Sequence, residues 1–111
     1  MADVSERIYV RTSLKVPGVG TVIHAAELEE KDATTCRMHR IVELAGTAPN
    51  SPIAGAATGS GKVRGMDAAP NPTVPHPDTY ANFPDIASQR LSAQEFERLW
   101  ARACAAFPDL A

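Results

Sequence analysis

The clearest hydrophobic pattern in the chain lies near its C-terminal end and predicts an amphipathic helix over residues 92–107. Apolar side chains recur there at the three- and four-residue spacing that places them on one face of a helix. They are Phe96, Leu99, Trp100, Ala103, Cys104 and Phe107. Ser92 and Glu95 have the spacing of a capping box, in which each side chain accepts a hydrogen bond from the other residue's backbone N–H. Pro108 should end the helix, because proline lacks the N–H that a helix interior needs.

Residues 7–16 alternate between apolar and polar positions, which predicts a strand with one buried face. The apolar side is formed by Ile8, Val10, Thr12, Leu14 and Val16, and the polar side by Arg7, Tyr9, Arg11, Ser13 and Lys15. Pro17 and Gly18 suit the two central positions of a type II turn. Residues 21–28 then predict the return strand of an antiparallel hairpin.

Residues 34–44 predict a third strand, because β-branched residues and the adjacent Gly46 favour a strand over a helix. Four apolar side chains share one face of this strand, and Arg40 interrupts them. A short fourth strand at residues 62–66 is the one further candidate.

Residues 46–78 have a different composition, with six of the nine prolines and five of the seven glycines of the chain. Such a stretch buries little apolar surface, so it predicts an irregular arm, followed by a connector at residues 79–90. We therefore expect a single α+β domain over residues 1–111. Its small antiparallel sheet of three to four strands would be packed by one C-terminal helix and carry a long Gly/Pro/Ala-rich loop.

Charge and composition narrow the choice of partners and compartment. The net charge of −2 gives no general attraction to nucleic acid or to an anionic membrane. No apolar run approaches the roughly 20 residues that span a bilayer, and the charged start lacks the apolar centre of a signal peptide. Cys36 and Cys104 form no disulfide framework. These observations favour a cytoplasmic protein.

The glycine-rich stretch at residues 56–63 invites comparison with a phosphate-binding loop. That motif needs a glycine where Ala56 stands and a hydroxyl where Val63 stands, and it needs a helix directly after the loop. We therefore interpret the stretch as a flexible glycine turn.

Two other groups of residues bear on metal binding and catalysis. His24, Cys36, His39 and His76 lack the short-spaced ligand pairs of a closed zinc site. The acidic turn at residues 27–32 can supply a carboxylate pair for acid–base chemistry, but such turns are more often solvated. We expect no catalytic residue, no cofactor and no metal site.

Residues 75–86 and 91–100 resemble a family of small bacterial domains of unknown function. The family has a short antiparallel sheet and a closing helix with the pattern S-x-x-E-F-E-x-L-W. Residues 26–30 and 40–46 match two of its strands loosely. The resemblance implies an α+β domain with a terminal helix on a small sheet, and it implies no reaction.

The function we expect is a non-enzymatic protein-interaction domain, an accessory subunit or modulator that docks on a larger bacterial protein. An immunity-type inhibitor of a toxin is one alternative, and a small enzyme or ligand-binding domain that uses the acidic turn and the histidines is another. We expect a protein partner rather than nucleic acid, membrane or a small molecule. The candidate partner-binding residues are Arg7, Tyr9, Arg11, Lys15, Pro49, Pro52, Ile53, Lys62, Arg64 and Met66.

Overall fold

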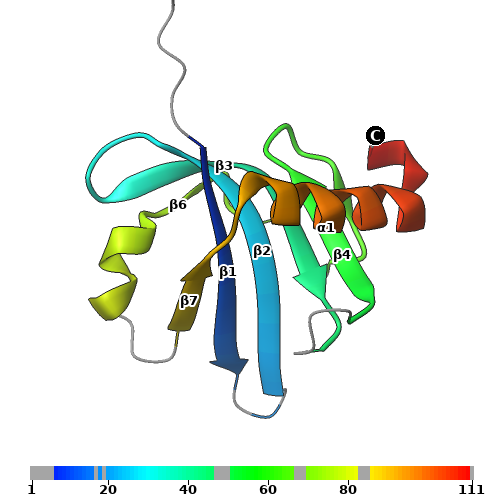
Figure 1. Cartoon of the computed structure of the whole chain (residues 1–111), viewed down its shortest axis with the longest axis horizontal. Coiled ribbons are helices and arrows are strands. Elements are labelled where there is room, and N and C mark those ends of the chain that lie inside the picture. Colours follow the sequence, from blue (N-terminus) through cyan, green and yellow to red (C-terminus); the bar gives the residue numbers. More distant parts are fainter. Residues whose placement is uncertain are drawn as a thin grey trace, which may run out of the picture.

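The computed structural model describes residues 7–16, 18, 20–46, 51–66, 70–82 and 86–110 of the chain. In this part of the chain seven strands form one antiparallel sheet, with one α-helix lying across it (Figure 1). The strand order is β5-β4-β3-β2-β1-β7, and β6 pairs with β3. The strands are β1 (Arg7–Val16), β2 (Gly20–Glu30), β3 (Thr35–Leu44), β4 (Ile53–Thr58), β5 (Val63–Arg64), β6 (Thr73–Pro75) and β7 (Ile86–Arg90).

The three longest strands, β1, β2 and β3, follow one another along the chain as an antiparallel meander. Their alternating and β-branched residues fit the pleated, half-buried surface of a sheet. Gly18 lies in the β1–β2 connection with a φ of 78°, a left-handed value that glycine adopts without strain. The hairpin predicted from residues 7–28 is therefore present.

The predicted fold class is wrong in the number of strands and in the long loop. Residues 46–78 were expected to be irregular except for a short candidate strand at 62–66. β5 lies within that candidate, but the stretch also contains β4 and β6, and the expected connector contains β7. The protein is consequently a mostly-sheet fold with a single C-terminal helix in its described part.

Strand β4 shows why composition misleads here. Its sequence, Ile-Ala-Gly-Ala-Ala-Thr, is poor in strand formers, yet Gly55, Ala56 and Ala57 are buried. A Cβ at Gly55 would lie 2.6 Å from Cγ of Met66 and 2.9 Å from the carbonyl oxygen of Arg64. Small residues are therefore required by close packing, and tertiary contacts outweigh the weak intrinsic propensity.

Helix α1 (Ala93–Ala106) begins as predicted. The Ser92 side chain accepts from the Glu95 backbone N–H, and the Glu95 carboxylate accepts from the Ser92 backbone N–H, each at 3.0 Å. The capping box is thus confirmed. The helix ends at Phe107, whose N–H donates to the Ala103 carbonyl, and Pro108 opens the short 3₁₀ helix η2 (Pro108–Leu110).

The apolar side chains form two clusters on opposite faces of the sheet. One contains Ile23, Val42 and Leu44, and Leu99, Trp100 and Phe107 pack against it from the helix side. The other contains Val10, Leu28, Cys36 and Met38, and Val74 of β6 packs against it. Since Ile23 and Leu28 stand an odd number of positions apart on β2, the two clusters lie on opposite faces. The sheet therefore buries apolar surface on both sides.

The second cluster is bordered by the segment that contains β6 and the 3₁₀ helix η1 (Pro77–Asn82). His76 lies between them and is buried. Its backbone N–H donates to the Thr34 carbonyl at 2.9 Å, and its Nε2 lies 2.9 Å from the Glu30 carboxylate. These contacts attach the segment to the β2–β3 turn.

Candidate functional site

Strand β3 changes its pairing partner halfway along one edge. Its C-terminal half pairs with β4, while its N-terminal half pairs with β6. Two backbone hydrogen bonds cover the junction: Gly59 N–H donates to the His39 carbonyl at 2.7 Å, and Met38 N–H donates to the Pro72 carbonyl at 2.8 Å. The backbone of β3 is thus satisfied across the junction, while the side chains around it leave a hollow.

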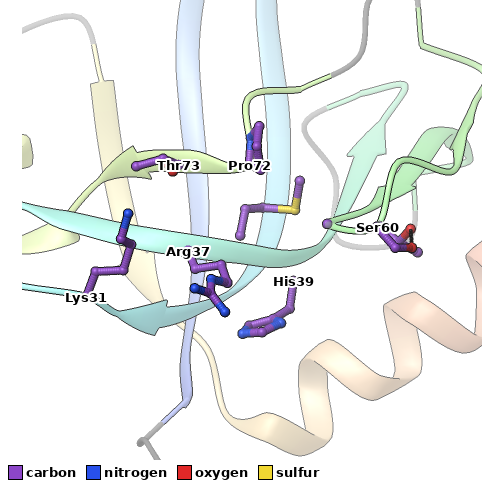
Figure 2. Close-up of a pocket in the computed structure, with 9 residues that line it drawn as sticks. Lys31, Arg37, His39, Ser60, Pro72 and Thr73 are labelled. Atoms are coloured by element: carbon purple, nitrogen blue, oxygen red, sulfur yellow. Dashed lines mark hydrogen bonds between the residues drawn. The ribbon is translucent and has the colours of Figure 1, made fainter.

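This hollow is an open pocket of about 550 Å³ (Figure 2). Strand β3 contributes Arg37, Met38 and His39, and Lys31 is the first residue of the β2–β3 turn. The remaining walls are the β4–β5 turn at residues 58–60 and residues 72–73 beside β6. We call it the β3-edge pocket.

The lining of the β3-edge pocket has a consistent charge. Lys31, Arg37 and His39 are basic, Thr58, Ser60 and Thr73 carry hydroxyls, and none of its described lining residues is acidic. Figure 2 shows Arg37 and His39 on the same side of β3, as expected for residues two apart on a strand. The pocket is therefore suited to an anionic group.

The three basic side chains differ in availability. His39 Nε2 lies 2.9 Å from Oε1 of Glu29 and 2.8 Å from Nη1 of Arg7. Lys31 and Arg37 are exposed, and within the described residues neither side chain makes a hydrogen bond or an ion pair. Two cations are thus free to bind an anion at the pocket rim.

The glycine-rich stretch forms one wall of this pocket, but not in the manner of a phosphate-binding loop. Thr58 N–H donates to the Lys62 carbonyl at 2.9 Å, closing a turn that leads into β5 rather than into a helix. The Lys62 ammonium donates to the Asp109 carbonyl at 3.3 Å. The turn itself is limited to residues 59–62, because residues 56–58 belong to β4 and Val63 opens β5. The cations of the pocket come from β3 and its preceding turn.

A second polar cluster lies on the same face of the sheet, under the first half of α1. Arg40 Nε donates to Glu27 at 2.6 Å, and its Nη2 donates to Glu97 of the helix at 2.6 Å. Its guanidinium carbon lies 5.0 Å from the ring centroid of Phe96 and 5.3 Å from that of Trp100. Tyr9 completes the cluster, with its hydroxyl donating to Glu27 at 3.1 Å. We call this group the Arg40 network.

Electrostatics in the Arg40 network favour the charged pair. Burial would raise the pKa of Glu27, but the hydrogen bond and the charge of Arg40 outweigh it and lower the pKa. Burial, followed by the charge of Glu27, raises the pKa of Tyr9. Glu27 is therefore a carboxylate held by a cation, and the network connects the helix to the sheet.

The acidic turn does not bring its carboxylates together as a catalytic pair. Glu27 belongs to the Arg40 network and Glu30 contacts His76, while Asp32 Oδ1 accepts hydrogen bonds from Thr34 and Thr35. These bonds, from the Thr34 backbone first, lower the pKa of Asp32 to about 2.

The four residues that were considered as zinc ligands have separate contacts. His24 contacts Glu43 at 3.1 Å, His39 contacts Glu29 and His76 contacts Glu30, while Cys36 is fully buried. Among the described residues, no group of three or more His, Cys, Asp and Glu side chains is placed to hold a metal ion.

The predicted partner-binding residues fall into two regions. On β1, Tyr9 lies under Phe96 of the helix, with ring centroids 5.5 Å apart, so the polar side of this strand is partly covered. Arg7 forms ion pairs with Glu27 and Glu29, at 3.7 and 3.4 Å. Arg11 is half-buried, and Lys15 is exposed.

The other predicted residues surround β4, β5 and the C-terminal turn. Arg64 Nε donates to Asp109 at 2.7 Å, as Lys62 does to the carbonyl of that residue. Ile53 packs against the helix-side cluster, the Pro52 carbonyl accepts from Ala45 N–H, and Met66 lies against Gly55. Pro49 lies outside the described residues.

Sequence reasoning missed Lys31 and Arg37, the two cations of the pocket that have no anionic partner among the described residues. They flank a turn that was interpreted by its acidic residues alone. The alternation of β3 does place Arg37 and His39 on one face, but residues 58–60 and 72–73 reach them only through the unpredicted strands β4 and β6.

Comparisons with protein families, with curated proteins and with solved structures found no match for this chain. The resemblance to a bacterial domain family therefore stays a prediction. No helix among the described residues is both long enough and apolar enough to cross a membrane.

Proposed function

We propose that the protein is a non-enzymatic protein-interaction domain of the bacterial cytoplasm, which docks on a larger protein as an accessory subunit or modulator. The β3-edge pocket would receive an anionic side chain of that partner. The observation that carries the proposal is the pair of exposed cations, Lys31 and Arg37, without an anionic partner among the described residues.

The shape of the pocket supports a macromolecular partner. Small-molecule sites bury most of their ligand in an enclosed and largely apolar cleft. The β3-edge pocket is open and polar, and hydroxyls and cations line much of it. A side chain that projects from another protein can enter such a hollow without being enclosed.

The surrounding charge argues against nucleic acid. Glu29, Glu30 and Asp32 lie next to Lys31 in the sequence, and the whole chain carries a net charge of −2. A nucleic-acid backbone presents a continuous row of phosphates, and these carboxylates would repel it. A short anionic segment of a protein, by contrast, needs to contact only Lys31 and Arg37.

Affinity purification from the native host tests this proposal with a matched control. The tagged chain is compared with Lys31→Glu/Arg37→Glu and with Lys15→Glu/Arg98→Glu, a double variant with the same change in net charge at two exposed positions outside the pocket. We expect wild type and the control to retain one co-purifying chain that the pocket variant loses. We also expect this partner, once purified, to bind wild type and the control but not the pocket variant. Equal recovery with all three proteins would contradict the proposal.

The same purified pair distinguishes an accessory subunit from an inhibitor. An immunity-type inhibitor abolishes the toxic activity of the chain that it binds, whereas an accessory subunit or modulator leaves its partner active. A growth assay of host cells that express the captured chain alone provides the measurement.

A further inference from the structure

The donors of the β3-edge pocket come from separate segments and surround a single space. Arg37 lies on β3, Lys31 on the preceding turn and Ser60 on the β4–β5 turn, while Thr73 lies on β6 in register with Arg37. All four side chains offer N–H or O–H groups. We propose that the group which this pocket binds is a phosphoryl group on a side chain of the partner, an inference that rests on the proposed function.

The number of donors favours a phosphoryl group over a carboxylate. The guanidinium of one arginine satisfies both oxygens of a carboxylate in a bidentate pair. An aspartate or glutamate paired with Arg37 in this way carries only one negative charge, so the positive charge of Lys31 would stay without a counter-ion. A phosphoryl group has three terminal oxygens and a charge of about −1.5 to −2, so it can accept from all of these donors.

Hydrogen bonding in the β4–β5 turn leaves one hydroxyl available. Thr58 Oγ1 accepts from Lys62 N–H at 3.3 Å and lies 2.8 Å from Ser60 Oγ. When Thr58 donates its hydroxyl hydrogen to Ser60, the hydrogen of Ser60 is free for a ligand. The Thr73 hydroxyl makes no hydrogen bond within the described part of the chain.

The charge balance is consistent with a dianion. Lys31 and Arg37 contribute two positive charges to the lining, and Glu29, the carboxylate in contact with His39, is already ion-paired with Arg7 at 3.4 Å. A phosphoryl dianion would neutralise the two free cations.

The first experiment measures the chemistry with defined probes. The ¹⁵N-labelled full chain is titrated at constant ionic strength with acetyl-glycyl-phosphoseryl-glycine amide and with the peptides that carry aspartate or serine in place of phosphoserine. We expect saturable amide shifts at Arg37, Ser60 and Thr73 with the phosphopeptide, and roughly tenfold weaker binding of the aspartate peptide, equivalent to about 1.4 kcal/mol. Equal binding of the two anionic peptides would overturn the phosphoryl assignment.

Single substitutions locate the site. Arg37→Gln should weaken phosphopeptide binding by roughly tenfold, because it removes a charge and a bidentate donor. Ser60→Ala should weaken it by a smaller factor, because it removes one neutral donor and no charge. Arg98→Gln removes an exposed arginine from the helix and should leave binding unchanged. The same loss in Arg98→Gln as in Arg37→Gln would show a general charge effect and overturn the site. Tighter binding of a mononucleotide than of the phosphopeptide would overturn the assignment to a protein side chain.

A second experiment separates this inference from the proposed function. Host lysate is treated with phosphatase before the affinity purification described above. Loss of the captured chain supports the inference. The other outcome is a chain that wild type still captures after phosphatase treatment and that the Lys31→Glu/Arg37→Glu variant does not capture. This result overturns the phosphoryl assignment and leaves the docking function intact. Phosphopeptide binding without any pocket-dependent capture overturns the docking function and, with it, the phosphorylated partner.

Discussion

Two arginines on one strand, Arg37 and Arg40, occupy opposite electrostatic situations. Arg40 is bound by Glu27 and Glu97, each at 2.6 Å, and lies against the rings of Phe96 and Trp100. Arg37 is exposed in the β3-edge pocket and meets no anion among the described residues. The first cation is used in holding the helix on the sheet, whereas the second is available to a ligand. Whether a charged residue stabilises the fold or stays available to a ligand therefore depends on its partners, and not on its type or its strand.

Removal of the ring beneath Arg40 should have the largest effect. Phe96 is fully buried, so Phe96→Ala should lower the free energy of unfolding by about 3–5 kcal/mol through a cavity. Urea denaturation measures the change. Trp100 is half-buried, and Trp100→Ala should cost less, about 2 kcal/mol. An effect of Trp100→Ala equal to or above that of Phe96→Ala would make tryptophan the main anchor of the helix.

Substitution of the two arginines tests the comparison directly. Arg40→Ala leaves the buried Glu27 carboxylate with only the longer contact to Arg7, at 3.7 Å, and should cost about 3 kcal/mol of unfolding free energy. Arg37→Ala should change stability by less than about 0.5 kcal/mol, as is usual for an exposed side chain. The double variant Arg40→Met/Glu27→Gln leaves no buried charge unpaired, so it should recover much of the unfolding free energy that Arg40→Ala loses. Equal destabilisation by Arg37→Ala and Arg40→Ala would remove the distinction between the two regions.

Acid should weaken the Arg40 network and the β2–β3 turn. Glu27 has a lowered pKa in the folded state, and that of Asp32 falls from 3.8 to about 2. The unfolded chain therefore binds more protons in this range, and stability falls as the pH decreases from about 5 towards 2. Thermal unfolding followed by circular dichroism between pH 2 and 7 gives the profile. Glu27→Gln and Asp32→Asn should each flatten it, and an unchanged slope in both would contradict the assignment.

The sequence was most informative where the chain folds by local rules. Ser92 and Glu95 cap a helix through contacts three residues apart, and the first hairpin follows from alternation and one glycine turn. Both were predicted because the physical cause lies within a few neighbouring residues.

Features that depend on distant partners escaped prediction. The alanines and glycine of β4 form a strand because Met66 and the helix require small residues there. Arg40 was interpreted as interrupting one apolar face of β3, but the apolar residues before and after it belong to clusters on opposite faces. The role of Arg40 depends on Glu97, which lies 57 residues later. The β3-edge pocket depends in the same way on β4 and β6, so its residues have no common signal in the sequence.

The division of the β3 edge between β4 and β6 also bears on aggregation. Exposed strand edges offer unpaired backbone groups to other chains, and long, flat edges are the most hazardous. The long strands β1, β2 and β3, of 10, 11 and 10 residues, are all flanked on both sides. The path of the sheet ends instead at β5 and β7, which are two and five residues long. The short strands β4 and β6 share the long edge of β3. They thus cover backbone donors and acceptors of β3 that would otherwise favour self-association.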